Sequence, residues 1–267
     1  MGPLRGAARG VSPADPLIHL VQVSLSYGLR RVLDAVDLRV DAGEVIGLIG
    51  PGGCGKTQLI KVMATLLTPI RGKVRIDGAC VGHGAAQARR DVRRRIGMQF
   101  QNFALFDSLS VLDNVAYPLL AAARRIDPAA RTKMLERAED LLARVGLAGT
   151  GELMPGALSG GMKRRVAVAR ALVARPRIAL FDDPTAGLDP VNSARILELI
   201  AAQAAGPERA VIIASHDLDR LLPIVGRLVM MRAGAIVLDG TPEEARKSED
   251  HGVRRFIGQE DDRGAAC

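Results

Sequence analysis

The chain has 267 residues, of which 48% are hydrophobic and 25% charged, so disorder throughout is excluded and one large domain, or a core with an inserted lobe, is expected. Aromatic residues make up only 3%, which argues against sugar-binding or base-stacking surfaces. The formal net charge of +8 fits binding to nucleic acid or an anionic membrane, but a merely basic outer surface is slightly favoured. The cysteines Cys54, Cys80 and Cys267 form neither a metal-type cluster nor a paired set, and no apolar run reaches about eighteen residues. We therefore expect a soluble, cytosolic chain.

Residues 1–15 are rich in Gly, Ala, Arg and Pro and are predicted to be a disordered tail. Short apolar runs typical of strands then alternate with helical patterns, which predicts a largely parallel sheet covered on both faces. Residues 102–165 contain no strand-like run and are predicted to form a helical lobe inserted in that sheet. The predicted strands cover residues 18–24, 38–40, 45–49, 96–100, 178–182, 210–215 and 228–231, and the predicted helices 56–66, 129–145 and 160–174.

A glycine-rich segment follows the predicted strand 45–49 and precedes the predicted helix 56–66. It fits the pattern G-x-x-x-x-G-K-[ST] and consists of Gly50, Pro51, Gly52, Gly53, Cys54, Gly55, Lys56 and Thr57. Its glycines permit backbone torsions that turn successive N–H groups toward phosphate oxygens, and the following helix directs its positive end at the same anion. We expect Lys56 to reach the β- and γ-phosphates and Thr57 to ligate Mg²⁺.

A phosphate loop of this kind needs a second strand that carries a carboxylate for the metal. The apolar run 178–182 ends at Asp182, which is followed by Asp183. In the common mechanism the first carboxylate holds the metal and the next polarises the attacking water. We therefore expect Asp182 to be a metal ligand and Asp183 to be the catalytic carboxylate.

A second anion-binding helix start lies at the sequence Ser159-Gly160-Gly161. Ser159 is a good N-cap residue, and the two glycines expose backbone amides. The chain thus has two phosphate-binding helix starts and one nucleotide-sized motif. The economical arrangement is a head-to-tail dimer, in which each ATP lies between the phosphate loop of one copy and Ser159 of the other.

This arrangement resembles the ATP-binding subunit of an ABC transporter, and the ordered motifs extend from residue 18 to about residue 240. The resemblance implies an α/β fold of the P-loop NTPase class, an ABC-type nucleotide-binding domain with an inserted helical subdomain and a small antiparallel β part. It implies that this domain covers residues 16–245, with a C-terminal tail over 246–267. It also implies hydrolysis of ATP with Mg²⁺ as cofactor.

The resemblance also implies roles for residues outside the phosphate loop. Tyr27 is expected to stack on adenine, and Gln58 to contact the α-phosphate. Gln101 is expected near the metal, where it links the sheet to the helical lobe. The loop that contains Asp189 is expected to cross the dimer interface, and His216 to sense the γ-phosphate and stabilise the charge that develops there.

Asp183 departs from the family pattern, which has Glu at this position. Asp is one methylene shorter, and a displacement of about 1 Å can cost about 10²-fold in rate. Either a backbone shift brings Asp183 into range with modest turnover, or the site mainly holds ATP. We expect slow but measurable hydrolysis.

Two further segments narrow the resemblance. Asp107 stands where many nutrient importers have Pro, and Met162 where importers usually have Gln. The segments 153–166 and 253–258 resemble the MlaF-like ATPases of bacterial Mla-type phospholipid transport. That resemblance implies a homodimer beneath inner-membrane permease subunits on the cytoplasmic face of the bacterial inner membrane. It further implies a lipid-binding periplasmic protein and a small cytosolic subunit as partners.

Other functions remain open from the sequence. The chain could serve another ABC importer or exporter of a small solute, or be a regulatory module that binds ATP without hydrolysing it. A DNA-associated ABC ATPase is a further alternative, but such proteins usually carry a coiled-coil, zinc-bearing or second ATPase domain, so no nucleic-acid partner is expected. The arginines of residues 89–95 are more simply interpreted as a solvated face than as contacts to lipid headgroups.

Overall fold

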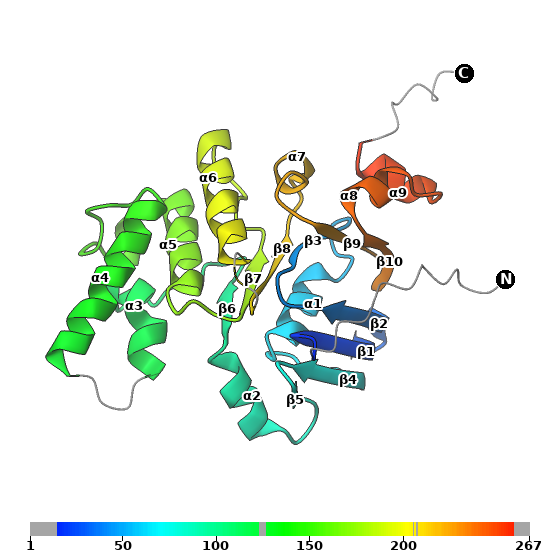
Figure 1. Cartoon of the computed structure of the whole chain (residues 1–267), viewed down its shortest axis with the longest axis horizontal. Helices are drawn as coiled ribbons and strands as arrows, with labels where there is room; N and C mark the ends of the chain where they lie inside the picture. Colours follow the sequence, from blue (N-terminus) through cyan, green and yellow to red (C-terminus); the bar gives the residue numbers. More distant parts are fainter. Residues whose placement is uncertain (1–14, 123–126, 205, 207, 259–267) are drawn as a thin grey trace.

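A computed structural model describes residues 15–122, 127–204, 206 and 208–258 of the chain. One of its two sheets is antiparallel, with strand order β2-β1-β4-β5 (Figure 1). Alternating apolar residues turn one face of this sheet to the core, and the other face carries charged side chains. Its strands are β1 (Ile18–Tyr27), β2 (Arg30–Val40), β4 (Arg71–Ile76) and β5 (Ala79–Cys80).

The second sheet has the order β10-β9-β3-β8-β7-β6, with only β10 antiparallel to its neighbour. Every residue of β7 and β8 is buried, as expected for strands covered on both faces. The strands are β3 (Val45–Ile49), β6 (Ile96–Gln99), β7 (Ile178–Asp182), β8 (Ala210–Ala214), β9 (Arg227–Arg232) and β10 (Ala235–Gly240).

The helices surround this sheet, and α3, α4 and α5 gather at one end of the molecule (Figure 1). In the described part of the chain, residues 100–177 contain helices but no strand. No described helix is both long and apolar enough to cross a bilayer. The helices are α1 (Lys56–Met63), α2 (Ala86–Arg93), α3 (Val111–Ala122), α4 (Pro128–Arg144), α5 (Gly160–Leu172), α6 (Pro190–Ala201), α7 (Leu218–Leu221), α8 (Pro242–Arg246) and α9 (His251–Phe256), with 3₁₀ turns η1 (Pro155–Ala157) and η2 (Ala202–Ala204).

The apolar core divides into two clusters, one on each face of the larger sheet. Along β7 successive residues alternate between them: Leu180 packs in the cluster beneath the antiparallel sheet and α1, and Phe181 packs in the cluster beneath the helical lobe. The same alternation occurs at Ile212 and Ile213 of β8. Burial on both sides fixes the strand ends that carry the site.

The element boundaries differ from the predicted ones in three ways. The first strand continues to Tyr27, and the first helix ends at Met63 because Thr65 adopts a φ of 58°. Strands β4, β5 and β10 and helices α2, α6, α7, α8 and α9 were missed, and β2 starts at Arg30 rather than at residue 38. Helix α9 lies inside the segment interpreted as a C-terminal tail, with Val253 fully buried, and most of the predicted N-terminal tail lies outside the described residues.

Candidate nucleotide site

The phosphate loop connects the end of β3 to the start of α1. Gly50, Gly53 and Gly55 have φ values of 139°, 72° and 112°, which side-chain-bearing residues rarely adopt. A Cβ at Gly50 would lie 2.1 Å from the carbonyl oxygen of Met231, so this position requires glycine. The loop is also held from behind, since the Gly234 N–H donates to the Cys54 carbonyl at 3.0 Å. These torsions and contacts fix the concave shape of the loop.

The Lys56 side chain lies inside this loop and is 7% exposed. Its ammonium donates to the carbonyl oxygens of Gly50 at 2.6 Å and Pro51 at 3.1 Å. A third, weaker contact reaches the Sγ of Cys54 at 3.8 Å. A buried ammonium is stabilised by a nearby anion. Lys56 is thus poised to interact with a phosphate at the mouth of the loop.

Two carboxylates at the end of β7 face the start of α1. Asp182 is 5% exposed and is hydrogen-bonded to the Thr57 side chain. Burial raises the pKa of Asp182, and so does the charge of Asp183, while the Thr57 hydrogen bond and the charges of Lys61 and Lys56 act in the opposite direction. Asp183 has a φ of 56°, and its N–H donates to the Ala214 carbonyl at 2.9 Å.

A cleft of about 250 Å³ joins the phosphate loop to the ends of β7 and β8. It brings together residues that lie far apart in the sequence and that the motifs predicted to act on one nucleotide. The residues that line the cleft are Gly52, Gly53, Gly55, Lys56, Thr57, Gln58, Gln101, Asp182, Asp183, Ala214, Ser215 and His216.

The donor set of this cleft fits Mg²⁺. The ion prefers oxygen ligands and usually combines one or two carboxylates with substrate phosphates. Thr57, Asp182 and Gln101 offer a hydroxyl, a carboxylate and an amide oxygen within one cleft. Within the described residues no group of three or more His, Cys, Asp or Glu side chains could hold a metal by itself, so the phosphates would complete the coordination.

Eight predicted residues do not line this cleft. Three of them, Gly50, Pro51 and Cys54, belong to the phosphate loop itself, and the other five lie elsewhere. Tyr27 ends β1 and is 53% exposed, and Ser159, Gly160 and Gly161 start α5. The Ser159 hydroxyl accepts from the Met162 N–H at 3.2 Å and so caps α5. Asp189 caps α6, and hydrogen bonds to its carboxylate, led by that from the Asn192 N–H, lower its pKa.

Gln99 is a supporting residue that the sequence analysis missed. Its side chain is fully buried; the amide oxygen accepts from the Asp182 N–H at 3.2 Å, and the amide nitrogen donates to the Phe100 carbonyl at 2.7 Å. Gln99 thereby fixes the start of the Asp182–Asp183 turn. A polar residue at the end of an apolar strand was the available signal, but only the pairing of β6 with β7 identifies its partner.

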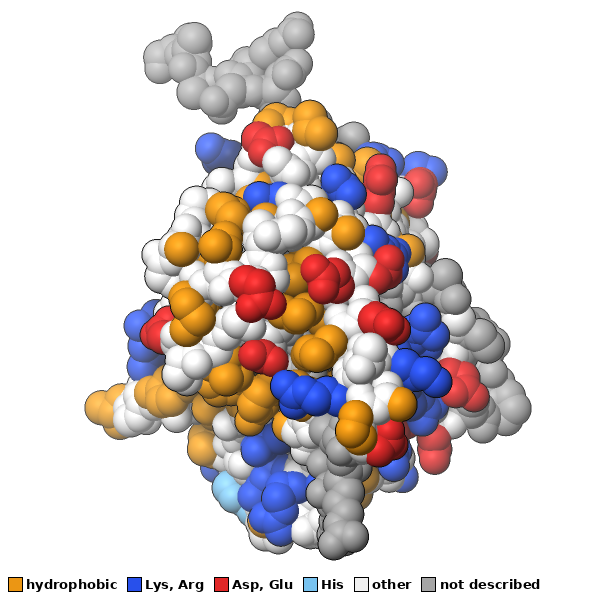
Figure 2. Space-filling model, turned by 90° about the vertical axis from the view of Figure 1, so that its left-hand side faces the viewer, with side chains coloured by type: hydrophobic (Ala, Val, Ile, Leu, Met, Phe, Trp, Pro, Cys, Tyr) orange, Lys and Arg blue, Asp and Glu red, His pale blue; other side chains and the backbone are white. Residues whose placement is uncertain are grey.

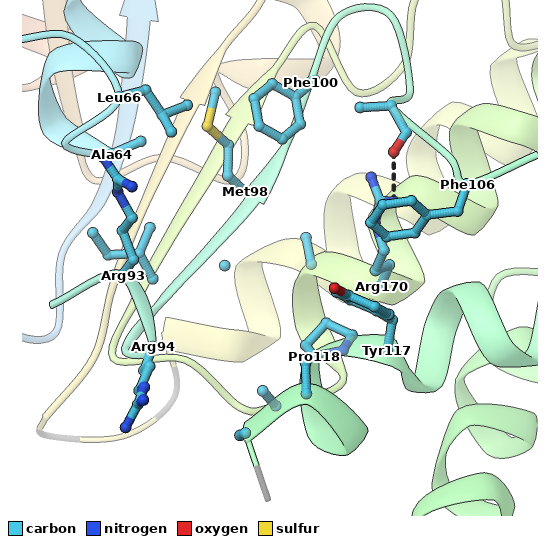
Figure 3. A pocket seen from close by; sticks show the side chains of 17 residues that line it. Ala64, Leu66, Arg93, Arg94, Met98, Phe100, Phe106, Tyr117, Pro118 and Arg170 are labelled. Carbon is cyan, nitrogen blue, oxygen red and sulfur yellow. Dashed lines mark hydrogen bonds between the residues drawn. The ribbon is translucent and has the colours of Figure 1, made fainter. Parts of the chain in front are cut away.

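A second cavity, of about 560 Å³, lies between the core and the helical lobe (Figure 3). Its walls are mostly apolar: Met98 and Phe100 lie on one side, and Phe106, Tyr117 and Pro118 on the other. Phe106 and Tyr117 are 41% and 42% exposed, and Arg93 and Arg94 lie at one end of the cavity. We call this cavity the interlobe groove.

Arg170 of α5 connects the interlobe groove to the segment that follows Gln101. Its guanidinium donates to the carbonyls of Phe103 and Ala104, both at 2.7 Å. Figure 3 draws one of these two bonds as a dashed line from Arg170. Phe103 and Ala104 have φ values of 59° and 50°, so two consecutive residues are held in the left-handed region. Arg170 is 8% exposed, and burial lowers its pKa.

The phosphate loop, the paired carboxylates, the exposed start of α5 and the sheet covered on both faces together define an ATP-hydrolysing P-loop protein. The family model for ABC transporters matches residues 33–186. The chain belongs to the ABC transporter family and is a P-loop ATPase subunit with the ABC-type nucleotide-binding fold.

Individual relatives differ in their cargo. The chain is 40% identical to the methionine import ATP-binding protein MetN of Caulobacter vibrioides, over 90% of this chain and 72% of the relative. It is 34% identical to the intermembrane phospholipid transport system ATP-binding protein MlaF of Haemophilus influenzae, over 92% of each. Among solved structures it matches the dimeric ATP-binding cassette MJ0796 in a post-hydrolysis state bound to ADP and Pi, with a TM-score of 0.79 and 28% identity over 84% of this chain and 98% of that one.

Proposed function

We propose that two copies of this chain close head-to-tail around two Mg-ATP and drive a membrane permease that moves phospholipid between bacterial membranes. The observation that carries the dimer is the exposure of the α5 start: Ser159 and Gly160 face solvent and lie outside the cleft of their own chain. Such a helix start suits a nucleotide held by a second copy. The solved dimer of an ATP-binding cassette with ADP and Pi supports the same arrangement.

Within each cleft the side chains have different roles in binding and hydrolysing ATP. Lys56 and the loop amides bind the phosphates, and Thr57, Asp182 and Gln101 would hold the metal, which neutralises phosphate charge when bound. Asp183 orients the attacking water, and His216 stabilises the charge that develops on the γ-phosphate. Gln58 contacts the α-phosphate. Tyr27 stacks on adenine, and Asp189 lies at the dimer interface.

The interlobe groove is the proposed docking site for the permease. An apolar cavity with exposed Phe106 and Tyr117 suits a short amphipathic segment of a partner. Arg170 contacts both the groove and the segment after Gln101, so a segment in the groove can influence the cleft. The chain would then work on the cytoplasmic face of the inner membrane.

The phospholipid cargo is supported by the full-length likeness to a phospholipid-transport ATPase and by the segments 153–166 and 253–258. A lipid-binding periplasmic protein and a small cytosolic subunit would complete that assembly. Import of a small solute is the second candidate, because a methionine-import ATPase shares the higher identity.

The test is capture of the tagged chain from detergent-solubilised native membranes. Recovery of a permease, a lipid-binding periplasmic protein and phospholipid supports the proposal, and a solute-binding protein without lipid would replace the cargo. Recovery of the chain alone or with DNA would contradict the transport role. Tyr117→Asp should lose the permease while it keeps ATP binding. The matched control is Leu29→Asp, which adds the same charge at the fully exposed tip of the β1–β2 hairpin.

A further inference from the structure

A row of arginines lies at the amino-terminal edge of the larger sheet, opposite the strand ends that carry the nucleotide site. Arg95, Arg177 and Arg209 each directly precede a strand, namely β6, β7 and β8. The strand register pairs Ile96 with Ile178 and Ile178 with Ala210, so the three arginines are neighbours. Adjacent strands lie about 4.8 Å apart, so the row extends over about 10 Å.

Two further arginines extend this row toward the helical lobe. Arg175 is exposed in the loop after α5, and Arg137 of α4 is close enough for charge repulsion. The pKa of Arg137 is lowered, first by burial and then by the charges of Arg175 and Arg209. We call the set of Arg95, Arg137, Arg175, Arg177 and Arg209 the arginine edge.

Acidic side chains offset only part of this charge. Asp77, with a side chain that is 6% exposed, forms ion pairs with both Arg95 and Arg177. Glu208 is exposed and adjoins Arg209. Within the described residues, no hydrogen bond or ion pair from the side chains of Arg137, Arg175 or Arg209 offsets their positive charge.

The arginine edge meets the interlobe groove. The groove is lined by Ile96 and Ala174, which adjoin Arg95 and Arg175 in sequence, and Arg93 and Arg94 lie where the groove approaches the start of β6 (Figure 3). In Figure 2, Lys and Arg side chains gather at the lower end of the face shown, the end at which Figure 1 has α2. The positive charge therefore borders the surface that the proposed function assigns to the permease.

We infer that the arginine edge binds the anionic headgroups of the bilayer in which the permease lies. This inference rests on the proposed function, because a permease in the groove brings the membrane to the side of the molecule on which the edge lies. Five arginines, three of them at the starts of neighbouring strands, suit several phosphates of a charged surface better than one small anion. Juxtamembrane arginines are attracted to anionic lipid over about one Debye length.

The test is flotation of the full chain with vesicles of phosphatidylcholine, alone or with about 30 mol% phosphatidylglycerol, at about 0.1 M salt. We expect at least about tenfold stronger binding to the anionic vesicles, and release at about 0.5 M salt. The variant R137Q/R175Q/R209Q should reduce this binding at least about tenfold. The control variant R246Q/K247Q/R255Q removes as many charges near the C-terminal helices and should retain it. Unchanged thermal stability and ATP binding in both variants establish that they are folded.

Three outcomes would overturn the inference. Equal binding to neutral and anionic vesicles, or equal loss in the two triple variants, excludes a specific role for the edge. Displacement from vesicles by about 10 mM inorganic phosphate at constant ionic strength indicates a discrete anion site. Wild-type vesicle binding by R137Q/R175Q/R209Q together with loss of the permease in the capture experiment assigns the edge to an acidic protein surface. Failure of the proposed function is distinct, since it would show as absence of the permease from the wild-type capture.

Discussion

The length and backbone of Asp183 bear directly on the rate of hydrolysis. Its side chain lines the cleft, and its left-handed φ of 56° is held by the hydrogen bond from its N–H to Ala214. Asp183→Glu should raise kcat by about ten- to a hundredfold, because the added methylene extends the carboxylate by about 1 Å toward the water. Asp183→Asn should reduce kcat almost to zero. Steady-state phosphate release tests both, with ATP binding as the control; full turnover by Asp183→Asn would exclude the assigned role.

The buried carboxylate of Asp182, next to Asp183, lowers the stability of the fold but is needed for the proposed metal site. Its folded-state pKa is raised above 3.8, so the folded protein disfavours the ionised form of Asp182. The contribution of Asp182 to the free energy of unfolding therefore falls as pH rises from 3.8 to the raised pKa, and it stays low above that pKa. Asp182→Asn should therefore raise Tm at neutral pH by a few degrees, at about 2–4 °C per kcal/mol, while it weakens Mg-dependent ATP binding.

Thermal melts of Asp182→Asn at several pH values would check this. The gain in Tm should shrink as pH falls through the raised pKa toward 3.8, because the carboxyl of the folded wild type is then protonated. Asp107→Asn, at an exposed position, is the control for the loss of one carboxylate. A lower Tm for Asp182→Asn at neutral pH would mean that the Thr57 and lysine interactions outweigh burial.

At the scale of elements, α5 and the segment after Gln101 form one unit through Arg170. Arg170→Met removes two charge-assisted hydrogen bonds and should lower the free energy of unfolding by about 2–4 kcal/mol. The stability of Arg170→Lys should lie between those of the wild type and Arg170→Met, since an ammonium cannot match the planar guanidinium that donates to both carbonyls. Urea denaturation measures the stability, and kcat should fall while the affinity for ATP stays constant. Wild-type turnover in Arg170→Met would show that Arg170 does not connect the interlobe groove to the nucleotide cleft.

How well each element could be predicted from the sequence depends on how that element is buried. The parallel strands were found because burial on both faces makes them continuous apolar runs, as in β7 and β8. Strand β4 was missed because it contains no continuous apolar run: the charged residues Arg71, Lys73 and Arg75 occupy every second position. The phosphate loop and the paired carboxylates lie in contiguous motifs, whereas Gln99 and the interlobe groove arise only from tertiary packing.

At the scale of the whole molecule, the cleft and the α5 start lie apart on one chain and would meet only across two copies. Ser159→Ala should leave ATP binding intact and weaken the ATP-driven dimer at least about tenfold, the loss expected for one hydrogen bond to a charged phosphate. Sedimentation in the presence of ATP, in an Asp183→Asn background, would measure this. Ser159→Asp preserves a helix cap but adds negative charge, so it should abolish the dimer, whereas Ser108→Ala should leave it unchanged. ATP-driven dimers of wild-type strength in Ser159→Ala would contradict a contact between copies.

The turn between β9 and β10 ties three parts of the molecule together through one residue. The Gly234 N–H donates to Cys54 in the phosphate loop, and its carbonyl accepts from the Asp34 N–H of β2 at 2.9 Å. The exchange of this single amide proton with deuterated solvent is consequently limited by how often the phosphate loop separates from its support. Gly234 is thus a native, label-free reporter: slower exchange on addition of ATP would measure how firmly the nucleotide fastens the loop to the rest of the fold.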